Sequence, residues 1–359
     1  MANKCTLEEM VNKEFWQNKK VFVTGHTGFK GSWLSIWLQH MGAEVCGYSL
    51  DAPTQPNNFT ESTASLGMHS ILDDTRNRDA VFRVMQEFKP EVVFHLAAQP
   101  LVRESYNDPF NTYETNVMGT LNVLDAARQT SSVKSIVNVT TDKCYENREW
   151  AWGYRENEPM GGYDPYSSSK GCSELLTSAF KRSYNMPLAS ARAGNVIGGG
   201  DWANDRIVPD TLRAFGNSKN VVVRYPDAIR PWQHVLEPLG GYLELAERVY
   251  YDNKYADSWN FGPNEDDAQP VRYILDYMKQ AWGGNVDWQT DGDEHPHEAH
   301  YLKLDISKAK TYLDWHPRWS LHDALNATIE WHKAWLDKQD MRAVTISQIN
   351  RYMNGENNE

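Results

Sequence analysis

The chain has 359 residues, and its 36 Lys and Arg against 48 Asp and Glu give a formal net charge of −12. This acidic balance disfavours a nucleic-acid partner or an anionic membrane surface, and no apolar run approaches the length of a membrane span. The four cysteines lack CxxC spacing, which argues against a disulfide framework and a zinc ribbon. We therefore expect a cytoplasmic protein with no membrane or nucleic-acid partner.

Short β-branched runs alternate with helix-length segments through the first half of the chain. Such alternation predicts an α/β fold with a doubly wound, parallel Rossmann-type sheet. The expected strands lie within residues 19–25, 44–50, 91–98, 135–141 and 187–198. The expected helices include residues 32–41, 78–88 and 119–129.

The first expected strand leads into the glycine-rich stretch GHTGFKG, in which Gly25, Gly28 and Gly31 precede a helix. A strand, a tight turn and a helix N-terminus in this order are typical of a dinucleotide pyrophosphate site, although glycines also form ordinary turns. The GxxGxxG spacing resembles that of the extended short-chain dehydrogenase/reductase family, which implies NAD as cofactor. Thr27 and Phe29 are assigned to the same site.

His26 lies between the first two glycines of this loop. We expect its bulky side chain to crowd the pyrophosphate and to weaken cofactor binding.

Residues after the next strands complete the expected cofactor site. Ser49 and Asp51 can hydrogen-bond the adenosine ribose, and the absence of Lys or Arg there favours NAD over NADP; Asp51 could instead cap the following turn. The resemblance places Asp73 and Asp74 at the adenine. It also places over the cofactor four residues of HLAAQ and one asparagine of the next helix, namely Leu96, Ala97, Ala98, Gln99 and Asn116.

The run YDPYSSSK predicts a helix start, because Asp164 is a good N-cap and Pro165 a favourable first residue. Tyr166 and Lys170 then lie on one face, where the lysine would lower the pKa of the tyrosine and so create a base for a sugar hydroxyl. A lone YxxxK is often only a surface pair. After a nucleotide loop, it matches the family's catalytic tyrosine and lysine, which also contact the cofactor.

The run TDKCY begins at Thr141, directly after an apolar strand. A neighbouring Asp and Lys on a loop could be a solvated pair. In the family, however, a threonine here binds the substrate hydroxyl, and the sugar-nucleotide 4,6-dehydratases add two acid–base residues after it, usually Asp and Glu. Asp142 and Lys143 therefore imply a dehydratase. The lysine, with GHTGFKGSWL and RAGNVIGGGDW, favours CDP-glucose as substrate.

The resemblance also implies the chemical steps. Tyr166 would remove the proton of the sugar 4-hydroxyl while the C4 hydride passes to NAD⁺, with Thr141 orienting the hydroxyl and Lys170 holding the tyrosine. The 4-ketone acidifies the C5 hydrogen. Lys143 and Asp142 would then serve as base at C5 and acid at the C6 oxygen, and the hydride would return to C6 to give a 4-keto-6-deoxy sugar.

Four residues of the second half of the chain are expected to bind the nucleotide sugar. By resemblance, Asn195, Arg206 and Arg230 contact its diphosphate, a role that suits the planar guanidinium donor. The glycines around Asn195 could equally form a hinge, and the arginines could be surface ion pairs. His234, close to Arg230 in the chain, is assigned to the substrate as well.

Three histidines, His295, His297 and His300, have a spacing that a metal could use. Since no cysteine and no regular element accompanies them, we expect a solvated loop near the nucleobase and no metal.

After about residue 198 the alternating pattern breaks into segments with Gly, Trp and Pro. We expect an NAD-binding domain over residues 1–198 with a returning segment at about 229–262. Residues 199–228 and 263–345 would form a smaller, mixed α/β substrate domain, and residues 346–359 a tail.

The family pairs subunits through the helix after HLAAQ and the helix that carries Tyr166, so we expect a homodimer or a homotetramer. Leu175, Leu176 and Phe180 lie on the latter helix and would be available for this contact.

Two other function classes remain open. A nucleotide-sugar 4-epimerase or reductase on the same fold would use Thr141, Tyr166 and Lys170 without needing Asp142 and Lys143. A non-catalytic NAD-binding protein would show no turnover with any nucleotide sugar.

Overall fold

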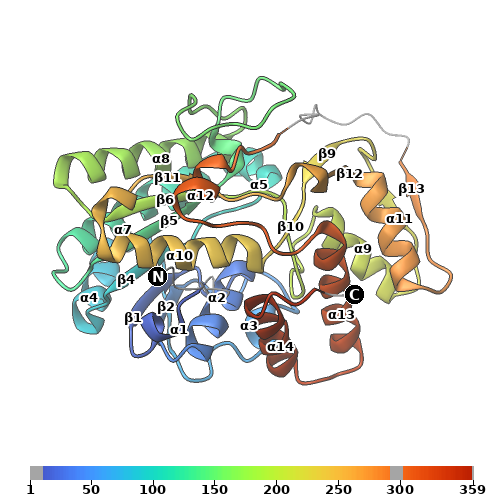
Figure 1. Cartoon of the computed structure of the whole chain (residues 1–359), viewed down its shortest axis with the longest axis horizontal. Coiled ribbons are helices and arrows are strands. Elements are labelled where there is room, and N and C mark those ends of the chain that lie inside the picture. Colours follow the sequence, from blue (N-terminus) through green and yellow to red (C-terminus); the bar gives the residue numbers. More distant parts are fainter. Residues whose placement is uncertain (1–10, 292–301, 358–359) are drawn as a thin grey trace, which may run out of the picture.

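The computed structural model describes residues 11–291 and 302–357. Its centre is a sheet of seven parallel strands in the order β11-β6-β5-β4-β1-β2-β3 (Figure 1). The chain order reverses between β1 and β4, the place where doubly wound sheets bind ligands, and this confirms the predicted fold class. The strands are β1 (Lys20–Thr24), β2 (Glu44–Ser49), β3 (His69–Leu72), β4 (Val92–His95), β5 (Ser135–Thr140), β6 (Leu188–Arg192) and β11 (Ser258–Asn260).

Helices cover both faces of this sheet, and its central strands β1, β4, β5 and β6 are buried on both sides. On one face, large apolar side chains such as Trp33, Trp37 and Tyr242 pack into the main core, and each such burial stabilises the fold by about 1.5–3 kcal/mol. The chain returns to the sheet through β11. The covering helices are α2 (Phe29–His40) and α10 (Leu236–Tyr251) on this face, and α4 (Arg78–Phe88), α7 (Gly119–Arg128) and α8 (Pro165–Tyr184) on the other.

A second, smaller core lies beside the large sheet, at the right of Figure 1. Its strands form two-stranded pairs, and its helices bury apolar residues such as Leu212, Ile274 and Leu325 between them. The elements are α9 (Ile207–Gly216), β8 (Val221–Val223), β9 (Ile229–Pro231), β12 (Ala268–Pro270), α11 (Val271–Trp282) and β13 (Trp288–Thr290).

Helix α13 (Leu321–Leu336) joins the two cores, since Trp331 packs into the main core and Ile329 into the smaller one. The segment after residue 346, predicted as a tail, continues instead as the second half of α14 (Met341–Met353). Tyr352 there is fully buried and donates a hydrogen bond of 2.9 Å to Glu237. The tail prediction was wrong because this helix carries apolar side chains at helical spacing.

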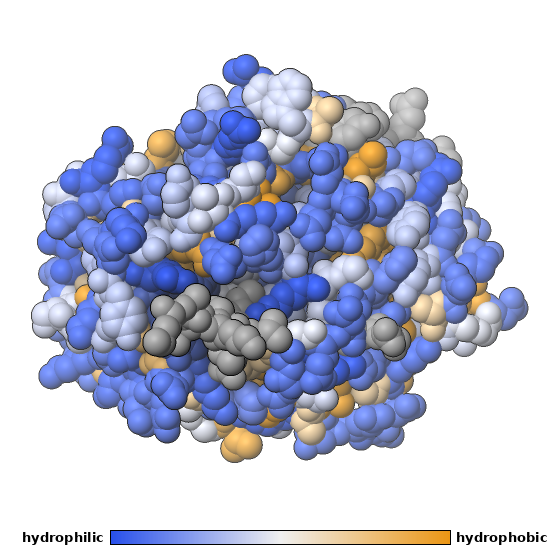
Figure 2. All heavy atoms as spheres, in the orientation of Figure 1, coloured by the Kyte–Doolittle hydropathy of each residue, from blue (hydrophilic) through white to orange (hydrophobic). Residues whose placement is uncertain are grey.

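The remaining elements are short connectors. The face seen in Figure 2 is largely hydrophilic, with hydrophobic side chains in small separate patches. No helix among residues 11–291 and 302–357 is long and apolar enough to cross a bilayer. The connectors are α1 (Lys13–Trp16), α3 (Asn58–Glu61), α5 (Val102–Asn107), α6 (Pro109–Tyr113), η1 (Glu114–Met118), η2 (Asp142–Cys144), β7 (Val196–Ile197), β10 (Gln233–His234), η3 (Asn253–Tyr255), η4 (Glu265–Asp267) and α12 (Ser307–Tyr312).

Candidate active site

The glycine loop between β1 and α2 is shaped by contacts that no side chain could replace. Gly25 has a φ of +74°, and a Cβ there would lie 2.8 Å from the backbone nitrogen of Ala97. A Cβ on Gly31 would lie 2.0 Å from the carbonyl oxygen of Gly25. Gly28 caps α2 without a side chain, and the first turn holds no acidic residue. The open helix N-terminus therefore fits a dinucleotide pyrophosphate.

Buried hydrogen bonds connect the end of β1 with α7. The Thr24 hydroxyl accepts hydrogen bonds from two backbone N–H groups after β4, those of Leu96 and Ala97, and lies 2.7 Å from Nδ1 of His95. Nε2 of His95 lies 3.0 Å from the hydroxyl of Thr120. Burial lowers the pKa of His95 to about 3, so the ring is neutral. No motif marks His95; only the strand register, which pairs it with Thr24, brings these groups together.

Asn116, predicted to lie over the cofactor, is 1% exposed in the π-helical turn η1. Its side chain donates to the Gln99 carbonyl at 3.1 Å and to the Ser169 hydroxyl at 2.9 Å, and it accepts from the Gln99 backbone N–H at 2.8 Å. Asn116 therefore ties the segment after β4 to α8. π-Helical turns occur frequently at functional sites, where they reposition one side chain within a helix.

The other residues predicted for the loop and the ribose differ in their exposure and in their contacts. The hydroxyls of Thr27 and Ser49 are buried and 2.8 Å apart, so they bond each other. Asp51 is exposed at the end of β2 and open to a ribose hydroxyl. Phe29 lies against the backbone at Gly198, where a Cβ would come within 3.2 Å of its ring.

The two acids predicted for the adenine have local partners. Asp74 binds Arg76 through two contacts of 2.6 and 2.8 Å. Burial alone would raise the pKa of Asp74, but the hydrogen bonds from Arg76 hold it below its ordinary value. Asp73 accepts a hydrogen bond of 2.7 Å from the backbone N–H of Asp74. Their carboxylates thus shape the turn after β3.

His26 does not crowd the pyrophosphate, contrary to the expectation. The ring is fully buried, its Nε2 lies 2.8 Å from the Ser70 hydroxyl, and it meets Phe59 edge to face at 5.2 Å. It fills the space above Gly47, where a Cβ would come within 2.3 Å of it. The His26 side chain points toward β2 and β3 and away from the opening of the glycine loop. His26 is therefore a packing residue.

Tyr166 and Thr141 meet at the end of β5. The Thr141 side chain hydrogen-bonds the Tyr166 hydroxyl and donates to Oδ1 of Asp142 at 2.9 Å. Asp164 caps α8 as predicted, accepting from a backbone N–H at 2.9 Å, and so sets the tyrosine on the first turn. Burial raises the pKa of Tyr166 to about 12. The hydrogen bond with Thr141 and the charge of Arg206 act in the opposite direction.

Lys170 lies one turn below Tyr166 on α8 and is 6% exposed. Its Nζ donates to the carbonyl oxygen of Val139 at 3.1 Å. Burial lowers the pKa of Lys170 to about 8, although the nearby Glu174 carboxylate raises it. The ammonium group is thus directed at the end of β5, and the lowering of the Tyr166 pKa by this lysine stays a prediction.

Asp142 and Lys143 do not pair with each other. Asp142 is 2% exposed, and its Oδ2 has no hydrogen-bond partner within the described parts of the chain. A Cβ on Gly194 would lie 1.8 Å from that oxygen, so only glycine fits opposite it. Lys143 is half-buried, and its backbone N–H donates to the Thr141 hydroxyl at 3.3 Å. The two side chains are thus separate groups, and of the two the Asp142 carboxylate acts on Tyr166.

A buried ion pair lies directly beneath this corner. Arg192 binds Glu174 of α8 through two contacts of 2.9 and 2.8 Å. The hydroxyls of Thr140 and Ser190 donate to the same carboxylate. Burial would raise the pKa of Glu174, but the charge and hydrogen bonds of Arg192 lower it. This pair was missed; a signal was present, since Glu174 continues the four-residue spacing of Tyr166 and Lys170.

The residues predicted for the substrate diphosphate lie on three separate segments of the chain. Arg206 is the N-cap of α9, binds Asp201 at 2.9 Å and acts electrostatically on Tyr166. Arg230 lies in β9, and its Nη1 donates to a carbonyl of that strand at 2.9 Å. Asn195 has a φ of +47° beside β7, and its carbonyl accepts from the Gln233 backbone. Of these three, Arg206 interacts with the catalytic corner.

His234, predicted to bind the substrate, is instead fully buried in the main core. Its ring lies between Trp33 and Trp319, with centroids 5.9 and 4.8 Å away. Burial lowers its pKa to about 3. The prediction failed because β10 pairs with β7 in a register that directs this side chain toward α2.

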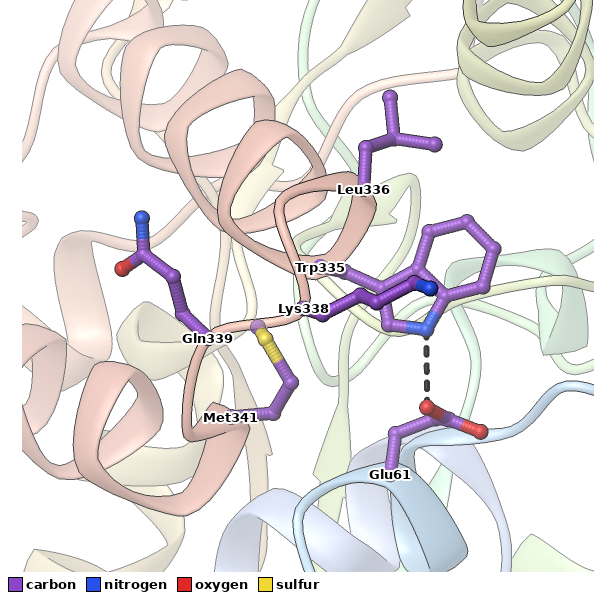
Figure 3. A pocket seen from close by; sticks show the side chains of 6 residues that line it. All are labelled: Glu61, Trp335, Leu336, Lys338, Gln339 and Met341. Carbon is purple, nitrogen blue, oxygen red and sulfur yellow. Dashed lines mark hydrogen bonds between the residues drawn. The ribbon is translucent and has the colours of Figure 1, made fainter.

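One cavity among the described residues lies away from these groups. It measures about 560 Å³ and lies between α3 and the connection from α13 to α14. Figure 3 shows one of its walls, where Trp335 donates a hydrogen bond of 2.8 Å to Glu61. None of the predicted site residues lines it. The three histidines weighed as a metal site, His295, His297 and His300, lie outside the described residues.

Comparisons with known proteins agree with this arrangement. The model of the GDP-mannose 4,6 dehydratase family matches residues 22–328. The chain belongs to this family. It is 56% identical to CDP-glucose 4,6-dehydratase of Salmonella typhimurium over 354 residues, which cover 96% of this chain and 99% of that protein.

Two solved structures share the fold of the family. The epimerase Mth375 of Methanothermobacter thermautotrophicus has a TM-score of 0.81 and 21% identity, covering 92% of this chain and 97% of that one. The dTDP-glucose 4,6-dehydratase of Bacillus anthracis, solved in complex with NAD, has a TM-score of 0.74 and 20% identity, covering 89% and 98%.

The charges of the site act on one more residue of this family member, which was not predicted. Lys30 is the second residue of α2, within the glycine stretch itself. Burial lowers its pKa to about 8, and the charges that act on it come from Arg206, Asp142, Lys170 and Asp201. The sequence offered only a lysine in a turn, which is common on protein surfaces.

Proposed function

We propose that the chain is an NAD-dependent 4,6-dehydratase that converts CDP-glucose to CDP-4-dehydro-6-deoxyglucose and water. The observation that carries this proposal is Asp142, a buried carboxylate with a free oxygen, placed beside Thr141 and Tyr166. An epimerase or a reductase has no use for such a group. The 56% identity to the Salmonella typhimurium CDP-glucose 4,6-dehydratase supports the substrate.

The glycine loop, Asn116 and the open start of α2 would hold NAD. Bound NAD supplies a hydride acceptor for C4 and returns the hydride to C6. Tyr166 takes the proton of the 4-hydroxyl at its phenolic oxygen, and Thr141 orients that hydroxyl. Because the pKa of Tyr166 is about 12, this step depends on the cations nearby and becomes easier as the pH rises.

Elimination of water uses the two residues after Thr141. The 4-ketone acidifies the C5 hydrogen, and Lys143 removes this proton through its Nζ, which has no bond to any residue within 11–291 or 302–357. The same group returns the proton to C5 when the hydride adds to C6, so the step balances. Asp142 protonates the leaving oxygen at C6 through its free Oδ2. Because Oδ1 is held by Thr141, the carboxyl group has one fixed and one reactive oxygen.

Product analysis tests this function. The purified protein with NAD is offered CDP-, dTDP-, UDP- and GDP-glucose, and the products are identified by mass and NMR. We expect CDP-glucose to lose its C6 oxygen as water and to yield a 4-keto sugar. Retention of the C6 oxygen with inversion at C4 would show an epimerase, and turnover with another nucleotide alone would reject CDP-glucose.

We further propose a homodimer, or a dimer of two such dimers, in the cytoplasm. Helix α8 contacts α5, α6 and η1, and these elements expose Phe110 (73%), Tyr106 (60%) and Met118 (49%) together with Leu175 (61%) of α8. Of the three α8 residues expected in the contact, Leu176 and Phe180 pack partly against the core and only Leu175 is fully available.

Sedimentation tests the assembly. Leu175→Glu should shift the protein toward the monomer, because a charge replaces an apolar contact. Leu66→Glu, at an equally exposed leucine of another region, should leave the mass unchanged. A monomeric wild-type protein at micromolar concentration would reject the dimer.

A further inference from the structure

The turn that carries the proposed acid and base is tied on both sides to one buried ion pair. This turn is η2, a single 3₁₀ turn of three residues that ends at Tyr145. Before it, the hydroxyl of Thr140 donates a hydrogen bond to Oε1 of Glu174. After it, the hydroxyl of Tyr145 accepts a hydrogen bond of 2.6 Å from Nη1 of Arg192. The two ends of the turn are therefore held by the two partners of the same ion pair.

The ion pair is a rigid link between these two ends. Arg192 binds Glu174 through Nε at 2.9 Å and Nη2 at 2.8 Å, which leaves Nη1 for Tyr145. Both charged side chains are only 3% exposed. Because the guanidinium group is planar, its two bonds to the carboxylate also fix the direction of the third donor. Glu174 thus sets the position of the Tyr145 hydroxyl through Arg192.

Tyr145 is buried and fully bonded within the protein. It is 1% exposed, its ring stacks on Tyr154 with centroids 5.3 Å apart, and its hydroxyl donates to Oδ1 of Asn260 at 2.7 Å. A backbone hydrogen bond of 2.8 Å from Gly161 to the carbonyl oxygen of Cys144 also holds this end of the turn. Since the Tyr145 hydroxyl already has a donor and an acceptor, any part it plays in the reaction must pass through the turn.

Lys143 depends on this end of the turn more than its neighbours do. Thr141 directly follows the other anchor, Thr140, and donates to Oδ1 of Asp142 at 2.9 Å. Lys143 lies two residues before Tyr145, and its ammonium group has no hydrogen bond or ion pair to the residues of 11–291 and 302–357. No polar contact of its own directs the Lys143 side chain, so the backbone of the turn sets where it points.

We propose that Tyr145 and Arg192 are positioning residues for Lys143, which they hold in the direction that removal of the C5 proton needs. The inference rests on the proposed function, in which Lys143 is the base at C5. Tyr145 acts through the turn, and Arg192 acts through Tyr145. Oxidation at C4 uses Thr141 and Tyr166, which lie before the turn and on α8, so the two positioning residues serve elimination and not oxidation.

Two variants remove the same hydrogen bond from its two sides. Tyr145→Phe deletes only the hydroxyl. Arg192→Lys keeps a positive charge beside Glu174 but lacks the guanidinium fork that also reaches Tyr145. The matched control is Tyr352→Phe, which removes the hydroxyl of another fully buried tyrosine, one that donates to Glu237 at 2.9 Å in the main core.

Stopped-flow absorbance and solvent exchange with the NAD-loaded protein and CDP-glucose separate the two steps. In Tyr145→Phe and Arg192→Lys, the reduced nicotinamide should form at the wild-type rate and then persist. Exchange of the C5 hydrogen with deuterated solvent should slow about tenfold to a hundredfold, as for a reacting group misplaced by up to about 1 Å. Tyr352→Phe should lower the temperature of unfolding without changing the ratio of the two rates. A loss of stability alone therefore does not imitate the expected result.

Hydrogen exchange of the backbone tests the positioning without any substrate. The N–H groups of Lys143 and Cys144 donate within the turn, to the hydroxyl and the carbonyl oxygen of Thr141. In Tyr145→Phe, the peptide that covers them should exchange about threefold to tenfold faster, as for the loss of one hydrogen bond, while β5 should be unchanged. If the wild type released no C6 oxygen, the proposed function would fail, and this measurement would still decide whether Tyr145 restrains the turn.

Four results would overturn the proposal. Normal C5 exchange in both variants would show that the hydrogen bond positions no base. Equal slowing of oxidation and elimination would make the bond a support of the whole site. Slow elimination with unchanged backbone exchange would mean that Tyr145 acts without restraining the turn. If Tyr145→Phe did not fold, Arg192→Lys would carry the same test, and failure of both to fold would assign the bond to stability alone.

Discussion

Two groups of residues on one face of α8 differ in whether their polar atoms have hydrogen-bond partners. We call the group around Glu174 the deeper level and the group around Tyr166 the upper level. At the deeper level, Glu174 receives hydrogen bonds from Thr140, Ser190 and Arg192, and its carboxylate is fully partnered. At the upper level, one turn of α8 and more away from Glu174, Tyr166 shares one threonine with Asp142, whose Oδ2 has no partner among the described residues. The reactive groups therefore rest on a scaffold whose own bonding needs are met.

This difference in hydrogen bonding predicts different effects of substitutions on stability and on activity. Breaking a satisfied buried pair leaves an uncompensated charge and should lower stability. Removing an unsatisfied reactive group should leave stability nearly unchanged and should abolish chemistry, because functional sites often retain groups that the fold alone does not need. Substitutions at the two levels should therefore have opposite signatures.

The largest effect is expected at Tyr166. Tyr166→Phe removes the only hydroxyl proposed to accept the sugar proton, so C4 oxidation should slow between about a hundredfold and ten-thousandfold. Nucleotide binding and thermal stability should be nearly unchanged. The control is Tyr163→Phe, three residues earlier and 95% exposed, which should behave as the wild type. Stopped-flow absorbance of the reduced nicotinamide measures the oxidation; a normal rate in Tyr166→Phe would exclude it as the base.

Lys143→Met tests the residue proposed as the base at C5. C4 oxidation should persist, but exchange of the C5 hydrogen with deuterated solvent should fall about a hundredfold or more, because no base remains at C5. NMR of the recovered nucleotide sugar measures the exchange. Exposed Lys254→Met serves as the control. Undiminished exchange in Lys143→Met would return this lysine to a solvated loop role.

Local sequence signals predicted the parts of the site that lie within one loop or one helix. The glycine loop, the cap at Asp164 and the pair Tyr166–Lys170 each follow from residues close in the chain. The position of Thr141 was also predictable, because a buried strand ends just before it. These features depend on spacing, and spacing can be read without the fold.

Features that arise from strand register were not predictable in the same way. Thr140 and Arg192 are aligned across β5 and β6, and this alignment places the arginine under Glu174. His234 was misassigned because a one-residue difference in a strand decides which face a side chain occupies. Lys30 was overlooked because the charges that act on it come from residues far away in the chain, such as Arg206 and Lys170.

Glu174→Gln tests the deeper level. It leaves the buried Arg192 without its charge partner and should lower the unfolding free energy by about 3–5 kcal/mol. The control is Glu330→Gln, at a surface pair with Arg351, which should cost less than about 1 kcal/mol. Urea unfolding measures both.

The pH dependence of that loss follows from the pKa of Glu174, which is lowered in the folded state. The stabilisation is therefore present above the ordinary pKa of 4.5 and is lost as the pH falls through the folded value. The difference between Glu174→Gln and the wild type should be full at neutral pH and shrink in acid. A difference that stays constant down to acid unfolding would contradict the role of this carboxylate charge.

The smallest effect links the two reactive groups of the upper level. The Asp142 carboxylate raises the pKa of Tyr166, whereas the proposed acid must be protonated when the C6 oxygen leaves. Asp142→Asn imitates that protonated state, so the pKa of Tyr166 should fall. The rate of C4 oxidation should then reach half its maximum about half a unit to one unit lower in pH than in the wild type. Asp314→Asn, at a carboxylate 89% exposed, provides the control and should leave the profile unchanged.

The same variant should release the C6 oxygen slowly, since an amide cannot donate the proton that Asp142 supplies. Pre-steady-state absorbance at a series of pH values gives the oxidation profile, and mass spectrometry of the sugar gives the loss of water. A profile shifted to higher pH would mean that Asp142 helps the tyrosine to ionise. Normal water loss would show that another group protonates the C6 oxygen, and the free Oδ2 of Asp142 would then need a different ligand.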